Sequence, residues 1–161
     1  MAARGLIAGT ALAGAAALGL GLALWPQDGA EAAFAPINPD AQDLVRGAEV
    51  YAAECAACHG ADLEGATDWR EPGPDGLYPA PPHDATGHTW HHDDATLYDY
   101  VALGGTGAMA KLGVEYDSGM PGYEDVLTEA ELRDVIAYIK STWPERERAA
   151  QKERTAAAQG S

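Results

Sequence analysis

Both cysteines of this 161-residue chain lie in one short segment, ECAACHG, and a histidine directly follows the second of them. A pair of thiols three positions apart, followed by a histidine, has four plausible chemical uses. These are a disulfide, a redox-active dithiol, half of a zinc site, and an attachment point for haem. Each use requires a different fold around the pair, so the choice among them constrains the chain more than any other feature.

Three of the four uses fit the remaining sequence poorly. A disulfide between Cys55 and Cys58 would close a very small loop, which constrains little of the unfolded chain. A redox dithiol of the thioredoxin type is expected in a βαβ setting, and no strand is predicted near this pair. A structural zinc site needs four ligands, usually from two such pairs, and the chain has no second pair of cysteines.

The C-x-x-C-H pattern is the attachment pattern of c-type haem. The two thiols add to the haem vinyl groups as thioethers, and the histidine beside the second thiol becomes the proximal iron ligand. At the end of a helix, positions i, i+3 and i+4 share a face, so Cys55, Cys58 and His59 can address one side of the flat macrocycle. The single Phe of the chain also indicates a thin apolar core, which a bound apolar cofactor would fill. We therefore predict one covalently bound haem c.

Met120 is the candidate for the second axial ligand of the iron. A thioether opposite a histidine raises the reduction potential of haem. Met120 lies in the glycine-containing loop YDSGMPGY, where an apolar core residue is less expected. Met109, in GTGAMAK, is the alternative ligand. A lone methionine can also be an ordinary filler of the core.

The N-terminal segment predicts export. Arg4 precedes an uncharged run from Gly5 to Trp25, and about 20 helical residues are long enough to span the hydrocarbon core. We expect residues 1–28 to be an uncleaved membrane anchor, although AEA at positions 30–32 leaves a cleaved signal sequence open. Either interpretation exports the domain. We therefore expect it on the periplasmic side of the bacterial cytoplasmic membrane, anchored, or free in the periplasm if the segment is cleaved.

The exported part is predicted to consist of short helices joined by long loops rich in glycine and proline. The predicted elements are a linker over 29–37, a helix over 38–54 capped by Asn38 or Asp40, a loop over 60–92, a helix over 94–103 ended by Gly104 and Gly105, and a last helix that begins after Thr128 and ends before Pro144. This last helix is predicted from a capping-box pattern of Thr128 and Glu131 and from an apolar stripe, which consists of Leu132, Val135, Ile136, Ile139 and Trp143. Long irregular loops need something to organise them, which again favours a cofactor. We expect an all-α haem domain over 38–144, followed by a charged, disordered tail over 145–161.

The chain resembles class I c-type cytochromes from about Gly47 to Trp143. The resemblance rests on G-x-x-x-Y-x-x-x-C-x-x-C-H-G ending at residue 60, on MPGY at 120–123 and on the closing helix LTEAELRDVIAYIKSTWP. It implies the cytochrome c fold, in which the N- and C-terminal helices cross at a glycine beside an aromatic residue; Gly47 and Tyr138 match these positions. It also implies a proline, Pro81 or Pro82, whose carbonyl accepts the second N–H of the proximal histidine.

The segment PAPPHDATGHTWHH is richer in histidine than a generic member of the family. Imidazole suits copper, so a copper-binding or copper-responsive haem protein is one alternative function. The residues concerned are His83, His88, His91 and His92. The simpler interpretation is that Trp90 and some of these histidines bind the haem propionates or cap the helix at Asp93 or Asp94.

The predicted function is one-electron transfer between components of a respiratory or photosynthetic chain. A formal charge of −15 argues against nucleic-acid binding. With His59 and Met120 on the iron, no open site remains for a small-molecule substrate, so we expect a carrier and not an enzyme. A haem enzyme or sensor is the alternative if Met120 does not bind the iron. The expected partners are redox proteins, namely a membrane oxidoreductase as donor and an oxidase or other acceptor.

The acidity itself has two interpretations. It can form a docking face for a basic patch on a partner, or it can simply keep the surface solvated. Mitochondrial members of the family are basic near the haem edge, so their docking partners do not carry over to this chain.

Overall fold

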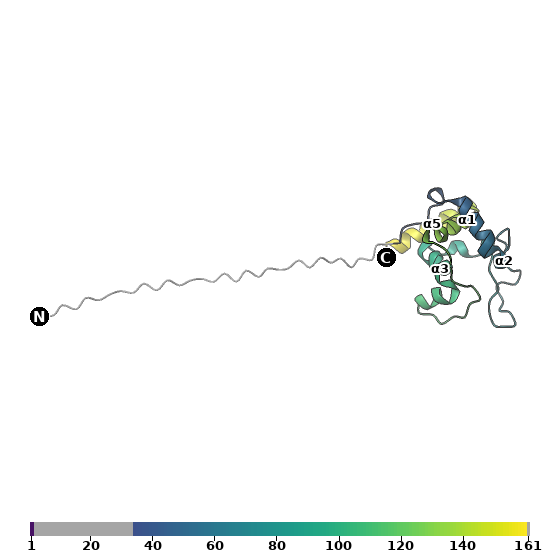
Figure 1. Ribbon diagram of the computed structural model, residues 1–161, viewed down its shortest axis with the longest axis horizontal. Helices are drawn as coiled ribbons and strands as arrows, with labels where there is room; N and C mark the ends of the chain where they lie inside the picture. Colours follow the sequence, from purple (N-terminus) through teal and green to yellow (C-terminus); the bar gives the residue numbers. More distant parts are fainter. Residues whose placement is uncertain (2–33, 161) are drawn as a thin grey trace. The chain divides into compact units, whose positions relative to one another are not determined.

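The computed structural model (Figure 1) describes residue 1 and residues 34–160. Its elements are η1 (Pro39–Ala41), α1 (Leu44–Val50), η2 (Tyr51–Cys55), α2 (Ala56–His59), η3 (Thr89–His91), α3 (Asp94–Lys111), α4 (Glu129–Ser141) and α5 (Glu145–Gln159). Within these residues there is no strand, which confirms the predicted all-α fold class. The long stretches between α2 and η3 and between α3 and α4 are irregular, as predicted.

The first predicted helix begins later than expected. Asn38 caps only the short η1, where its Oδ1 accepts the N–H of Asp40 at 3.1 Å. The backbone then extends at Gln42, and Asp43 caps α1 by accepting the N–H of Arg46 at 3.0 Å. From α1 the chain continues helically through η2, a π-helical turn, and α2. The helix therefore carries the cysteines to its very end.

Helices α1 and α4 cross at Gly47, as the resemblance implied. A side chain at this position would collide with the backbone carbonyl of Asp134 and with Cβ of Tyr138. The crossing is tied by the Asp134 side chain, which is buried and accepts the N–H of Asp43 at 3.0 Å and Nε of Arg46 at 2.6 Å. Only glycine permits this close approach of the two backbones.

Helix α4 confirms the predicted capping box and the predicted apolar stripe. Thr128 Oγ1 accepts the N–H of Glu131, and the Glu131 carboxylate accepts the N–H of Thr128. The buried residues of the stripe are Leu132, Val135, Ile136, Ile139 and Trp143. They place α4 at the centre of the core.

Helix α3 breaks where the sequence predicts its end, but the chain then resumes a helix. Gly104 has φ 73° and ψ 172°, and a second helical segment runs on to Lys111. The break lies against the loop of Met120: a side chain at Gly104 would meet the carbonyl of Met120, and the Gly105 N–H donates to that carbonyl at 3.1 Å. The prediction of a helix ending at this point is thus only partly right, because a tertiary contact makes a kink.

The predicted disordered tail is wrong. Residues 145–159 form helix α5, which buries Glu147, Gln151 and Thr155 along one face at a spacing of four residues. These buried residues are polar, so the apolar pattern that reveals an amphipathic helix is missing from this segment. Contacts of that face with the rest of the fold order the helix.

The predicted membrane anchor lies outside the described residues, as does most of the predicted linker. Among the helices within residues 34–160, none is both long and apolar enough to cross a bilayer. The anchor therefore stays a prediction.

Candidate functional site

The C-x-x-C-H segment closes the first helical run. Cys55 is half-buried at the end of η2, Cys58 is exposed in α2, and both thiols are free. Gly60 follows with φ 82°, and its N–H donates to the carbonyl of Ala56 at 3.0 Å. The chain then turns away, which leaves both cysteines and His59 within the last turns of the helix.

The thiol of Cys55 is not prepared for redox catalysis. Burial raises its pKa to about 11, and the negative charges of Glu54 and Cys58 add to that effect. Reactive dithiols need a lowered thiol pKa, because the thiolate is the nucleophile. This environment argues against the dithiol interpretation of the pair.

His59 is held in a defined orientation and tautomer. The side chain is 7% exposed, and Nδ1 lies 2.9 Å from the carbonyl oxygen of Pro81. Since a carbonyl can only accept, Nδ1 carries the proton and Nε2 keeps its lone pair. Burial lowers the pKa of His59, with the hydrogen bond to Pro81 opposing the shift in part. The ring is thus a neutral imidazole with one nitrogen available to a metal, and Pro81 rather than Pro82 orients it.

The loop around His59 is tied to the helical core at several points. The carbonyl of His59 accepts the N–H of Gly65 at 2.7 Å. The ring of His83 lies nearly parallel to that of His59, with 4.0 Å between centroids and 19° between planes. Trp143, the last residue of the apolar stripe, donates Nε1 to the carbonyl of His83 at 2.7 Å. The C-terminal part of the core therefore holds the segment that packs on His59.

The loop of Met120 is linked to the same helical end. Tyr123 donates its hydroxyl to the carbonyl of Glu54 at 2.8 Å, one residue before Cys55. Ser118 Oγ accepts the N–H of Met120 at 3.1 Å, and Met120 is half-buried. These contacts bring the MPGY segment to the C-x-x-C-H segment, an association that the predicted ligand pair requires.

Met109, the alternative ligand, already has a partner for its sulfur. The hydroxyl of Tyr100 lies 3.0 Å from its Sδ. A thioether that accepts this hydrogen bond is less available to a metal. The geometry therefore favours Met120 among the two candidates.

The four histidines of the 83–92 segment do not converge on one point. His83 packs on His59, His88 on Trp69, His91 on Trp90 and His92 on Tyr100. His88 and His92 also lie edge to face, with 5.5 Å between ring centroids. Across residues 34–160, no group of three or more His, Cys, Asp or Glu side chains is arranged to hold a metal ion. This finding weighs against both the copper site and the zinc site.

Two ring nitrogens near η3 are buried without a hydrogen-bond partner among the described residues. They are Nδ1 of His88 and Nε1 of Trp90. The indole Nε1 of Trp90 is always a donor, and a buried donor without an acceptor is costly, so it indicates an acceptor supplied from elsewhere. The cap of α3 is Asp93, whose Oδ1 accepts the N–H groups of Ala95 and Thr96, and no histidine takes that role.

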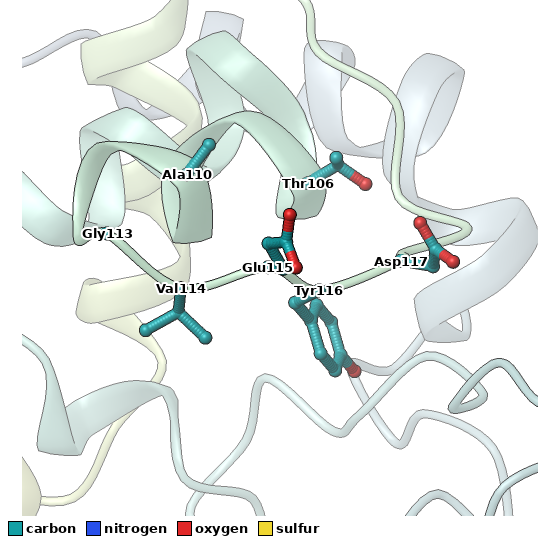
Figure 2. A pocket seen from close by; sticks show the side chains of 7 residues that line it. All are labelled: Thr106, Ala110, Gly113, Val114, Glu115, Tyr116 and Asp117. Atoms are coloured by element: carbon teal, nitrogen blue, oxygen red, sulfur yellow. The ribbon is translucent and has the colours of Figure 1, made fainter.

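A shallow hollow of about 550 Å³ lies over the end of α3 and the loop that follows it (Figure 2). Its lining residues are Thr106, Ala110, Gly113, Val114, Glu115, Tyr116 and Asp117. Figure 2 shows Val114 and Tyr116 projecting from the same side of the loop. Cys55, Cys58, His59 and Met120 do not line this hollow, so it is separate from the predicted ligands.

Comparison with protein families places this chain. The family model described as Cytochrome c matches residues 44–143, which include α1 to α4 and all four predicted haem-binding residues. Neither the curated proteins nor the solved structures gave a match. Helix α5 lies beyond the matched span.

Proposed function

Because this chain belongs to the cytochrome c family, which carries electrons through a covalently bound haem c, we propose that it is a single-haem carrier with its iron between His59 and Met120. The described residues fit that cofactor. Cys55 and Cys58 are free thiols at the required spacing and would form the two thioethers. When bound, the haem supplies the one-electron couple of its iron. The chain attaches it, orients it and limits its contact with water.

One observation supports the proposal most directly, namely the orientation of His59. Its Nδ1 proton is committed to the carbonyl of Pro81, and its ring is buried and neutral. An axial histidine needs its second ring nitrogen protonated and hydrogen-bonded, because that bond sets the ring orientation and the basicity of the ligating nitrogen. A redox dithiol or a disulfide would give the neighbouring histidine no reason to be held in this way.

Met120 would fill the second axial position. Gly119, where an added Cβ would meet nothing nearer than Leu77 at 3.8 Å, leaves room for a flat cofactor, and Pro121 stiffens the turn. Gly122 instead lets the loop pack against the backbone of α3. A neutral thioether stabilises ferrous iron relative to ferric iron, so the reduction potential should be positive. Two filled axial positions leave no coordination site for a substrate, which is why a carrier is proposed over a haem enzyme or sensor.

The denatured protein tests the attachment. Mass spectrometry after denaturation should show one haem retained on the chain, because thioethers survive unfolding while axial ligands do not. Release of all haem on denaturation would refute attachment through Cys55 and Cys58. Ready binding of carbon monoxide by the native ferrous protein would instead refute the Met120 ligand and favour a haem enzyme or sensor.

We further propose that the carrier works on the periplasmic side of a bacterial membrane, in a respiratory or photosynthetic chain. This proposal rests on the uncharged run from Gly5 to Trp25, which predicts export.

The charge of the chain is unevenly distributed along the sequence. Residues 49–128 hold 15 Asp and Glu against only Arg70 and Lys111, whereas residues 129–161 hold six acidic and six basic residues. The part of the chain that carries the predicted ligands is therefore the acidic part, which suits a redox partner with a basic docking face.

The salt dependence of electron transfer tests this partner. The rate with the physiological donor or acceptor should fall as ionic strength rises, because salt screens attraction between separated surface charges. A rate that stays constant between low and physiological salt would show that the acidity serves solubility alone.

A further inference from the structure

Helix α5 lies beyond Trp143, where the match to the family ends, and yet it is part of the packed fold. Its buried face is polar, and Gln151 at the centre of that face is only 1% exposed. Burying an amide is favourable only where its polar atoms find partners. The partners of Gln151 therefore indicate what this helix holds in place.

Gln151 reaches both the end of η3 and the start of α3. Its Nε2 donates to Oδ1 of Asp94 at 2.8 Å and lies 3.3 Å from the carbonyl oxygen of His92. Both of these oxygens are acceptors, which assigns the amide nitrogen rather than Oε1 to this side. Thr155 adds a contact one turn later, since its Oγ1 accepts the N–H of Asp94 at 3.1 Å. Helix α5 thus fixes the junction between η3 and α3.

Lys140 of α4 holds the same junction. Its Nζ donates to Oδ1 of Asp94 at 2.5 Å and to the carbonyl of Ile37 at 2.6 Å. Oδ2 of Asp94 in turn accepts the N–H of Ile37 at 2.8 Å. A buried polar group with this many directional partners has few alternative positions. The residues of η3, which end three positions before Asp94, are therefore held in one register.

The other end of η3 is tied to the surroundings of His59. Thr89 donates its hydroxyl to the carbonyl of Pro82 at 3.3 Å, and its Oγ1 lies 2.9 Å from Nδ1 of His83. Because the hydroxyl proton is used on Pro82, Oγ1 accepts the proton of His83. The ring of His83 lies against that of His59. Contacts therefore run without a gap from Gln151 to His59.

We propose that α5 is a positioning element for the proximal ligand, in which Gln151 holds η3 so that Thr89 keeps His83 against the ring of His59. The proposal rests on iron ligation by His59, as argued above, and adds a residue outside the family's span that acts on this ligand through others. The orientation of a ligating imidazole depends on the groups packed around it. A helix that immobilises those groups contributes to the reduction potential without touching the cofactor.

Three variants of the haem-loaded protein test the proposal. Gln151→Leu keeps the approximate volume and removes the amide, and Thr89→Val keeps the shape and removes the hydroxyl. Lys152→Ala is the matched control, because it changes the exposed neighbour of Gln151 on the same helix. Each variant is compared with the wild type in its unfolding midpoint, its equilibrium with a redox standard, and the exchange rate of the Nδ1 proton of His59 measured by NMR.

Gln151→Leu and Thr89→Val should each accelerate exchange of the His59 proton. Each should also shift the redox equilibrium by about two- to tenfold toward the ferric form, as expected for loss of coupling through a packed network. The direction follows because a looser site admits water, which stabilises the more highly charged iron. The double variant should shift the equilibrium by less than the two single effects combined, since both break one chain of contacts. Lys152→Ala should match the wild type.

The proposal is overturned if Gln151→Leu lowers the unfolding midpoint but leaves the proton exchange and the redox equilibrium at their wild-type values. Helix α5 would then stabilise the fold only. If Gln151→Leu does not fold, Thr155→Val decides through the same two readouts, because it removes the acceptor of the Asp94 N–H and of Gln151 Nε2 while Gln151 itself stays in place. A wild-type protein without a six-coordinate haem spectrum would refute the ligand assignment itself before any variant is compared.

Discussion

Helices α1 and α4 differ from the loops, above all that over 112–123, in what holds them in place. Helix α4 buries an apolar stripe, with Val135 at 0% exposure, and contacts α1 at a close crossing. In the segment 112–123, by contrast, no residue is buried, and Leu112 is 63% exposed. The loops are held by hydrogen bonds to the helices, such as that of Tyr123 to the carbonyl of Glu54. Burial builds the scaffold, and directional contacts place the site on it.

This comparison predicts that substitutions at the packed contacts of α1 and α4 mainly change stability, whereas a substitution at Met120 in the loop over 112–123 changes the haem with little effect on stability. The following predictions run from the largest expected change in the free energy of unfolding to the smallest.

Lys140→Met should destabilise the fold most, by about 3–5 kcal/mol, because it leaves the buried carboxylate of Asp94 without its cation. The measurement is chemical denaturation of the haem-loaded protein. Lys111→Met is the matched control, since the pair of Lys111 with Asp99 is largely exposed and should contribute less than about 1 kcal/mol. Equal losses for both variants would contradict the distinction between scaffold and surface.

Gly47→Ala should cost about 1–3 kcal/mol, as expected for overpacking at a tight contact. The added methyl group would meet the carbonyl of Asp134, so α1 and α4 must move apart. Gly160→Ala, at the end of α5, is the control, because its nearest neighbours lie 3.8 Å away. Calorimetric or denaturant unfolding should separate the two variants. A Gly47→Ala protein as stable as the control would show that the crossing is not tight.

Acid should destabilise the protein through its buried histidines. Burial lowers the pKa of His83 well below its ordinary value, and the nearby His59 and His88 lower it further. The unfolded chain then binds a proton at a pH where the folded chain does not, so stability falls as the pH drops below about 6.5. Each such histidine can contribute up to about 2 kcal/mol by pH 5. Unfolding measured at pH 7, 6 and 5 should show this slope.

A matched pair of substitutions assigns the slope. His83→Gln should reduce the dependence of stability on pH, whereas His91→Gln, at an exposed position, should leave it close to that of the wild type. An unchanged slope in His83→Gln would mean that the acid sensitivity arises elsewhere.

Met120→Ala should change stability least, by about 1 kcal/mol, because the side chain is only half-buried. It should nevertheless open the sixth coordination position, lower the reduction potential and let carbon monoxide bind to the ferrous protein. Met109→Ala is the matched control and should leave the iron six-coordinate, since its sulfur already accepts the hydroxyl of Tyr100. The reverse pattern of carbon monoxide binding would identify Met109 as the ligand.

Short-range patterns in the sequence predicted a large part of this protein. The spacing of Cys55, Cys58 and His59 predicted that the C-x-x-C-H segment lies on one face at the end of a helix, and the structure places it there. The Thr128–Glu131 capping box likewise begins α4 where the pattern indicated. The apolar stripe of α4 follows from the same local rules. Each of these signals involves residues within one or two helical turns, so no knowledge of the fold is needed to read it.

Features that depend on contacts between distant segments required the tertiary structure. The structure shows that Pro81, and not Pro82, accepts the hydrogen bond of His59, which lies 22 positions earlier in the chain. The sequence left both prolines open, because the loop between them has no periodic pattern from which their positions could be predicted. The segment of helix α5 was predicted to be disordered because it is charged and rich in alanine. Its buried face is polar, and polar burial becomes favourable only when specific partners, here Asp94 and the carbonyl of His92, are already in place. The sequence by itself determined which chemistry this chain can attach, since that depends on local spacing. Only the tertiary structure decided how the attached group's ligands are held, since that depends on which distant polar atoms come within hydrogen-bonding distance.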